Sequence, residues 1–412
     1  MIKTSALLLS TIFFSISCLA SNLKTEPKPI VSGYEIQHES KVFNETRRYM
    51  VSLPERYNMN NRDYPSLFVI DADFQFQHVS AVVKNLTRMG KIAPMIVIGI
   101  ANQGSDDYLK TTTWPDPKDQ AFGDAKKMQK YLTSELLPLI DTTYRTNKQK
   151  ALSGYSLGGL FTLYSMMQEN TPFNAFLSMS PSAWFDNYGL PAKLSPLLKA
   201  NKLNSPIFIS VANEEEMGVD KVVEVFSNNA DKNLNWQFKH YPNENHFTTA
   251  LPALYDGLQF LAPNYALDGT DMLAIGDYQA VLKHFKNQQK SWAGYQFGWL
   301  QAYQFAKYMF WSKQIGQADE ILAAVKRDFP ESLTMVTIHL ANGFNKKKNY
   351  AKALQLLQSI ETPGQNYPGW HKQMSQYYQG IERQDLAEKY QAKAISLAKE
   401  YRFESWEIWE LM

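Results

Sequence analysis

The chain has 412 residues, 44% of them hydrophobic, and its 42 basic and 40 acidic side chains leave a formal net charge of +2 at pH 7. A nearly neutral chain without a long basic run offers no surface for nucleic acid, so we expect no partner of that class. The length is sufficient for a catalytic domain followed by a second, smaller domain.

The N-terminal segment predicts export. A positive charge at Lys3 precedes an apolar run over residues 6–16, and small residues follow as far as Ala20. This is the pattern of a secretory signal, and the apolar run is shorter than the roughly 20 residues that a spanning helix needs. We therefore expect a signal peptide at residues 1–20 and a periplasmic or secreted product without stable membrane insertion. Lipoprotein anchoring through Cys18, the only cysteine, is the alternative.

Residues 30–263 alternate short β-rich runs with helical patterns, which is typical of a mostly parallel sheet with helices on both faces. The first two runs alternate polar and apolar residues as antiparallel edge strands do, whereas the runs at 66–70, 95–100 and 175–179 are nearly continuous in apolar residues, as buried strands are. The predicted strands are 34–38, 48–53, 66–70, 95–100, 150–153, 175–179, 206–211 and 236–241, and residues 125–144 have helical spacing. The fold class expected for this domain is therefore α/β.

Residues 265–412 predict an all-α domain, because strand-like runs vanish and apolar residues recur at helical spacing. Segments that begin at Gln317, Tyr350 and Leu386 recur at roughly the 34-residue period of tetratricopeptide helix pairs, although no copy has the full signature. We expect a tetratricopeptide-like helical domain that binds a protein partner. Its alternative is an accessory bundle that only covers the first domain.

The segment Gly154-Tyr155-Ser156-Leu157-Gly158 has the form G-x-S-x-G between a predicted strand and a predicted helix. In this context the serine lies on a tight turn that exposes its hydroxyl above the sheet, and the glycines let the helix pack closely. The N–H of Leu157, at the start of the helix, would stabilise the oxyanion of acyl transfer. The sequence thus predicts an α/β-hydrolase fold with Ser156 as nucleophile. A glycine-rich turn with an incidental serine is the alternative.

A serine nucleophile needs a base, and this fold orders serine, acid and histidine along the chain. His240 falls within a predicted strand, and the later histidines, apart from one, belong to the helical tail. The exception is His246, in the loop after the last predicted strand, where the fold presents its base. We predict that His246 is the general base.

The acid that orients His246 should follow the strand 206–211. Four carboxylates qualify on position: Glu214, Glu215, Glu216 and, farther on, Asp220. The residues alone leave that choice open. A second oxyanion donor is expected from the loop after the third strand, where we favour the backbone N–H of Asp73, with Phe74 as the alternative.

The sequence also indicates which kinds of ligand to expect. No histidine and carboxylate cluster has metal spacing, and no phosphate or dinucleotide loop follows a strand, so we expect no metal and no cofactor. Aromatic residues fall in loops that should surround the site, which would suit an aromatic or acyl pocket, although ordinary packing explains them equally well. They are Tyr108, Trp114, Tyr155 and Trp184. Tyr155 and Trp184, together with Phe74, are the candidate substrate contacts.

Several of these stretches resemble the putative-esterase family of α/β-hydrolases, which includes siderophore, feruloyl and acetyl-xylan esterases, S-formylglutathione hydrolase and mycolyl transferases. The similar stretches are Tyr64–Asp73, Gly154–Gly159 and Ser180–Trp184. The resemblance implies a serine esterase for small-molecule esters. It also selects the acid, because the family's Val-Gly-x-x-Glu pattern is matched by Val211–Glu215 and points to Glu215.

Among subgroups, the chain is most similar to bacterial siderophore esterases, which hydrolyse the trilactone of catecholate siderophores. One segment departs from their pattern, because residues 105–110 carry no arginine where an Arg-rich segment is usual. The function predicted from the sequence is therefore ester hydrolysis through an acyl-enzyme and a Ser-His-Glu triad. A serine peptidase with the same triad, or a non-catalytic scaffold acting through the helical tail, are the alternatives.

Overall fold

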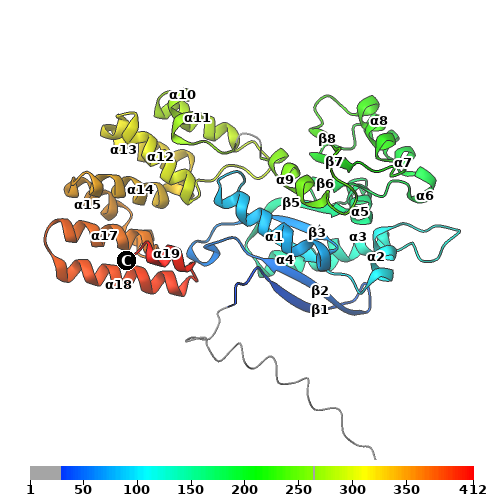
Figure 1. Ribbon diagram of the computed structural model, residues 1–412, viewed down its shortest axis with the longest axis horizontal. Helices are drawn as coiled ribbons and strands as arrows, with labels where there is room; N and C mark the ends of the chain where they lie inside the picture. Colours follow the sequence, from blue (N-terminus) through cyan, green and yellow to red (C-terminus); the bar gives the residue numbers. More distant parts are fainter. Residues whose placement is uncertain (1–28, 263–264) are drawn as a thin grey trace, which may run out of the picture. The chain divides into compact units, whose positions relative to one another are not determined.

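The computed structural model describes residues 29–262 and 265–412 (Figure 1). The predicted signal peptide at 1–20, which includes Cys18, lies outside the described residues, and so do residues 263–264 at the predicted domain boundary. Gly33–Met412 forms one unit that contains both the sheet and the C-terminal helices.

The sheet has eight strands in the order β1-β2-β4-β3-β5-β6-β7-β8. The pair β1 and β2 is antiparallel, β2 is antiparallel to β4, and all other neighbours are parallel. The strands are β1 (Tyr34–Ser40), β2 (Glu45–Ser52), β3 (Tyr64–Ile70), β4 (Ile96–Ile100), β5 (Thr146–Tyr155), β6 (Ala175–Met179), β7 (Ile207–Ala212) and β8 (Trp236–Tyr241). The predicted α/β fold is confirmed, since the alternating runs form the antiparallel edge and β3, β4 and β6 are buried throughout.

Helices cover both faces of this sheet because successive side chains of a strand point to opposite sides. Leu67 and Val69 of β3 pack with one set of helices, whereas Phe68 and Ile70 pack with the other. The first set is α1 (Ala72–Arg88) and α9 (Ala250–Phe260). The second is α2 (Ser105–Thr112), α3 (Ala125–Tyr131), α4 (Leu137–Thr143), α5 (Leu157–Met166), α6 (Phe185–Tyr188), α7 (Leu190–Lys199) and α8 (Val219–Asn229).

The helical stretch predicted at 125–144 is interrupted. A π-helical turn, η3 (Leu132–Leu136), separates α3 from α4. Pro138 at the start of α4 explains the break, because proline lacks an N–H and its ring displaces the carbonyl four residues earlier.

The C-terminal region is helical, as predicted (Figure 1). Its helices are α10 (Gly269–Ile275), α11 (Tyr278–Gln288), α12 (Trp299–Trp311), α13 (Ala318–Asp328), α14 (Leu333–Lys346), α15 (Tyr350–Ser359), α16 (Glu361–Gly364), α17 (Pro368–Gly380), α18 (Gln384–Glu400) and α19 (Ser405–Trp409). Short helical turns precede and follow α13 at η4 (Gln314–Gln317) and η5 (Pro330–Ser332), and another, η2 (Tyr57–Met59), lies between β2 and β3. The starts of α12, α14 and α17 at 299, 333 and 368 are 34 and 35 residues apart. The tetratricopeptide likeness stays a prediction that this spacing favours.

One hydrophobic core joins the sheet to the C-terminal helices. It includes Leu67 of β3, Val79 of α1 and Leu258 of α9 together with Phe305 of α12 and Leu340 of α14. The helices therefore bury the α1 and α9 side of the sheet. No helix within residues 29–262 or 265–412 is long and apolar enough to cross a membrane.

Candidate active site

Ser156 lies on a sharp turn between β5 and α5. Its φ of 58° and ψ of −122° are unusual for a residue with a side chain, and such strain is typical of functional turns. The turn is possible only because its neighbours are small. A Cβ at Gly154 would lie 2.0 Å from the carbonyl oxygen of Gly158, so strand and helix approach too closely for any side chain there.

The hydroxyl of Ser156 contacts His246, and His246 contacts a carboxylate. Ser156 Oγ is 3.0 Å from His246 Nε2, and His246 Nδ1 is 2.5 Å from Oε2 of Glu214. The side chains of His246 and Glu214 are 29% and 9% exposed, so the carboxylate is shielded while the imidazole is open to a ligand. The serine, histidine and carboxylate thus have the arrangement of a nucleophile, its base and the group that orients the base.

The acid in contact with His246 differs from the sequence-based choice. Glu214 holds the imidazole. The predicted acid, Glu215, is exposed, and so are Glu216 and Asp220. The reason lies in the backbone after β7, which ends at Ala212: the N–H of Glu214 donates to the Ala212 carbonyl at 3.0 Å, and Glu214 Oε1 accepts from the Ala212 N–H at 3.2 Å. This tight turn points Glu214 inward one residue earlier than the family pattern predicted.

The pKa of the Glu214 carboxyl is lowered, although burial alone would raise it. Hydrogen bonds from His246 and Ser180 and the charge of the imidazolium outweigh the desolvation. Glu214 is therefore ionised over the neutral range and can stabilise a protonated His246.

The loop that carries His246 is tied to its surroundings at two points. The Tyr155 hydroxyl donates to the carbonyl of His246, and the Tyr155 ring lies 4.9 Å from the imidazole, centroid to centroid. The N–H of Asn213 donates to the Glu244 carbonyl at 2.9 Å, which joins the loops after β7 and β8. These contacts hold the imidazole between Glu214 and Ser156.

Ser182 is a further polar residue beside Ser156. Its Oγ is 3.3 Å from Ser156 Oγ, and its N–H donates to the Ser156 carbonyl at 3.1 Å. The sequence contained a signal for it, because Ser182 belongs to the Ser180–Trp184 stretch that is similar to the esterase family.

Leu157 and Asp73, from which we predicted oxyanion donors, lie in the first turns of α5 and α1. N–H groups in a first turn have no partner within their own helix, so both positions offer donors. The start of α1 is held by its side chains: Asp73 Oδ1 accepts from Arg48 at 3.0 Å, and Asp73 Oδ2 accepts from the Asn102 N–H at 3.0 Å. The Asn102 amide also donates to Asp71 at 2.7 Å.

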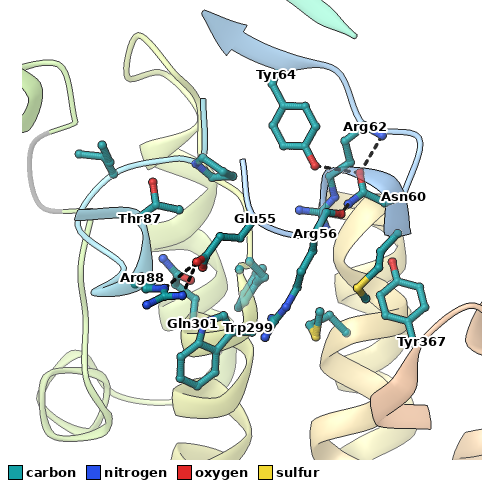
Figure 2. A pocket seen from close by; sticks show the side chains of 16 residues that line it. Glu55, Arg56, Asn60, Arg62, Tyr64, Thr87, Arg88, Trp299, Gln301 and Tyr367 are labelled. Carbon is teal, nitrogen blue, oxygen red and sulfur yellow. Dashed lines mark hydrogen bonds and ion pairs between the residues drawn. The ribbon is translucent and has the colours of Figure 1, made fainter. Parts of the chain in front are cut away.

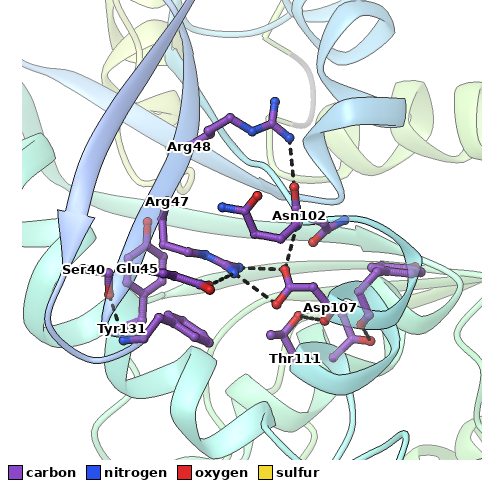
Figure 3. Close-up of polar contacts among 12 residues, drawn as sticks. Ser40, Glu45, Arg47, Arg48, Asn102, Asp107, Thr111 and Tyr131 are labelled. Carbon is purple, nitrogen blue, oxygen red and sulfur yellow. Dashed lines mark hydrogen bonds and ion pairs between the residues drawn. The ribbon is translucent and has the colours of Figure 1, made fainter.

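Tyr108 was expected in a loop but lies in α2, where it braces the start of α5. Its hydroxyl accepts from the Gly158 N–H at 3.0 Å and donates to the Tyr155 carbonyl at 3.2 Å. The preceding residue, Asp107, receives two hydrogen bonds of 3.0 and 2.9 Å from Arg47 of β2, whose side chain is 1% exposed (Figure 3). An ion pair with a buried guanidinium thus fixes α2 against β2, and α2 places Tyr108 against the turn that carries Ser156.

Only some of the aromatic side chains that we expected around the site are exposed. Phe74 and Trp184, which we proposed as substrate contacts, are 81% and 41% exposed. Trp114 instead packs against Phe185 and its indole N–H donates to Asp186 at 2.8 Å, so it is a core residue. Phe247, directly after His246, is 92% exposed and was not singled out from the sequence.

Comparisons with known proteins agree with this architecture. Residues 40–251, just over half the chain, match the family described as putative esterase. The chain is 23% identical over 169 residues to the ferri-bacillibactin esterase BesA of Bacillus subtilis and 23% identical over 190 residues to a siderophore enterobactin esterase of Emericella nidulans. These alignments cover 36% and 38% of this chain but only 58% and 63% of the two relatives.

Solved structures share the fold. The IroE-like serine hydrolase of Shewanella oneidensis has a TM-score of 0.62 at 23% identity, over 72% of this chain and 99% of that one. A protein of Capnocytophaga ochracea without a described function has a TM-score of 0.58 at 17% identity, over 79% of this chain and 93% of that one. The chain is an α/β-hydrolase, a class to which the sheet order and the serine turn already assigned it. It belongs to the putative-esterase family and is a carboxylic-ester hydrolase.

Proposed function

We propose that the chain cleaves carboxylic esters through Ser156, His246 and Glu214 by way of an acyl-enzyme. Ser156 Oγ attacks the ester carbonyl while His246 Nε2 accepts its proton, and the imidazolium then protonates the departing alcohol. Water, deprotonated by His246, releases the acid from the acyl-enzyme. The single observation that carries this proposal is the continuous contact from Ser156 Oγ to Nε2 at 3.0 Å and from Nδ1 to Glu214 at 2.5 Å.

The backbone N–H groups of Leu157 and Asp73 are the proposed oxyanion donors. Removing one such donor typically costs about 10²- to 10³-fold in kcat, which makes the placement of α1 and α5 part of the catalytic machinery. The ion pair from Arg48 to Asp73 and the hydrogen bond from Gly158 to Tyr108 support these two turns.

We further propose an exported enzyme for a siderophore-lactone-type ester or another small ester. The export proposal rests on the sequence pattern of residues 1–20. The substrate proposal rests on the two relatives named as siderophore esterases, while the exposed Phe74, Trp184 and Phe247 offer apolar contacts for an acyl or aromatic group.

The proposal is tested by hydrolysis of p-nitrophenyl acetate and butyrate, and of a catecholate siderophore trilactone. We expect turnover by the parent chain and its loss in Ser156→Ala and His246→Ala. Ser227→Ala and His240→Gln, which replace exposed residues of the same types, are the matched controls and should retain full activity. Turnover that persists in Ser156→Ala would contradict the mechanism, whereas selective failure on the trilactone would reject only the substrate class.

A further inference from the structure

Two adjoining cavities lie where the loop after β2 and the end of α1 meet the C-terminal helices, and Figure 2 shows the smaller of the two. They share Arg56, Met59, Trp299, Met335 and Tyr367 as lining residues. The inner cavity has a volume of about 80 Å³ and the outer one about 290 Å³. They are remote from Ser156, because the inner cavity adjoins Tyr64 at the start of β3, whereas Ser156 follows the end of the parallel neighbour β5.

The inner cavity is lined by three guanidinium groups, two of which have carboxylate partners. Arg56 bonds to Glu407 at 2.5 Å, and Arg88 bonds to Glu55 at 2.5 Å and to Glu404 at 3.2 Å.

The third guanidinium belongs to Arg62, which donates to the neutral oxygens of Gln296 at 3.3 Å and of the Glu331 backbone at 2.8 Å. Within the described part of the chain, no carboxylate lies within ion-pair distance of Arg62. A positive charge therefore faces the inner cavity without a negative partner.

The Arg62 guanidinium offers charge-assisted hydrogen bonds to an anionic oxygen, and such bonds are stronger than those between neutral groups. The inner cavity, with a volume of about 80 Å³, accommodates a carboxylate group but little more.

The outer cavity has the opposite character. Trp299, Ile338, Phe403 and Trp406 supply an apolar lining, and about 290 Å³ is roughly twice the volume of a cavity known to hold benzene. Its acidic groups are Glu407, which Arg56 neutralises, and Glu410 at the exposed rim. A negative head would therefore be attracted to Arg62, which fixes the orientation of a ligand that has one charged and one apolar end.

We propose that these joined cavities bind a monocarboxylic acid with an apolar body, with the carboxylate at Arg62 and the body among Trp299, Phe403 and Trp406. The site is separate from Ser156 and the inference does not depend on ester hydrolysis. Helix α19 forms the outer wall through Trp406, and its ion pairs from Glu407 to Arg56 and from Glu404 to Lys84 and Arg88 hold that wall in place.

The test is calorimetric titration of the full chain with octanoate, octanol and acetate, with tryptophan fluorescence as a second readout because Trp299 and Trp406 line the site. We expect saturable binding of octanoate and at least tenfold weaker binding of octanol, which lacks the charge, and of acetate, which lacks the body. Arg62→Gln should weaken octanoate about 10- to 100-fold without affecting octanol. Trp406→Ala should weaken both.

Two matched variants control for surface effects. Arg383→Gln replaces an exposed arginine outside the cavities, and Trp409→Ala replaces a 69% exposed tryptophan of the same helix that does not line them, so both should bind octanoate as the parent does. Trp406→Ala provides the second test if Arg62→Gln misfolds. Equal binding of octanol and octanoate, octanoate binding unchanged in a folded Arg62→Gln, or octanoate binding unchanged in Trp406→Ala would overturn the proposal, including the case in which octanoate occupies the Ser156 site.

Discussion

The Glu214 carboxylate lies 2.5 Å from Nδ1 of His246, and its other oxygen is held by the N–H of Ala212 at 3.2 Å. Both oxygens are thus engaged, so the carboxylate cannot rotate away from the imidazole. We expect Glu214→Gln to lower kcat by up to about 10⁴-fold, because an amide no longer stabilises the imidazolium that forms during acyl transfer. Glu215→Gln is the matched control, since Glu215 is exposed beside it, and its kcat should equal that of the parent. If Glu214→Gln and Glu215→Gln lowered kcat for p-nitrophenyl butyrate hydrolysis equally, the result would contradict this assignment.

Tyr108→Phe removes the hydroxyl through which Tyr108 forms hydrogen bonds with the turn at Ser156. The Gly158 N–H then loses its acceptor and the start of α5 loses a fixed contact. We expect kcat to fall by about tenfold with KM nearly unchanged, because the effect on the oxyanion is greater in the transition state than in the ground state. Tyr164→Phe, on α5 itself, is a suitable control, and a change confined to KM would show that Tyr108 acts on substrate binding instead.

The buried pair of Arg47 and Asp107 predicts a non-additive stability effect. Arg47→Met removes the two hydrogen bonds that Asp107 accepts from Arg47 and leaves the one from the Gln103 N–H, so the unfolding free energy should fall by about 3–5 kcal/mol. The double variant Arg47→Met with Asp107→Leu removes both charges and should be more stable than Arg47→Met alone. Urea unfolding of the single and double variants measures this, and simple additivity of the two losses would speak against a coupled pair.

His339 predicts a pH dependence of stability. Burial, with the positive charges of Arg56 and Lys346, lowers the pKa of His339 to about 4, so the folded chain keeps it neutral while the unfolded chain protonates it near its ordinary value of 6.5. Because the unfolded state then binds more protons between these two values, stability falls as pH drops from about 6.5 toward 4.

We expect the fall in melting temperature between pH 7.5 and pH 5 to be smaller in His339→Gln than in the parent chain. His240→Gln, which replaces an exposed histidine of β8, should show the same fall as the parent. Identical falls in all three proteins would show that His339 does not contribute to the acid sensitivity.

Local patterns in the sequence predicted most of the fold. The apolar runs and the serine turn are encoded within a few neighbouring residues, so the strand series, the helix after Ser156 and the loop carrying His246 could be found without coordinates. Helix α2 was missed because its 8 residues, Ser105–Thr112, are too few and too polar to show a clear period.

Features that depend on distant contacts or on one turn could not be predicted. The choice between Glu214 and Glu215 is made by two hydrogen bonds within a turn, and a one-residue difference in that turn exchanges an inward side chain for an outward one. Arg47 and Asp107 are 60 residues apart, and nothing in either local sequence indicates the other. The second site, at Arg62 and Trp406, requires the sheet and the last helix together.

The shared core between the sheet and the C-terminal helices has a consequence for how the protein can be divided. Phe305 and Leu340 are buried in the same apolar cluster as Val79 and Leu258, so cutting the chain near residue 263 would expose one flank of the catalytic half to water. Melting of the whole protein should therefore be a single calorimetric transition, and the severed halves should aggregate when expressed apart but recover solubility when produced together. The C-terminal helices would then act as a permanently bound subunit does, but within one chain. They could be lost in evolution only after the apolar side chains of α1 and α9 that they cover had been replaced by polar ones.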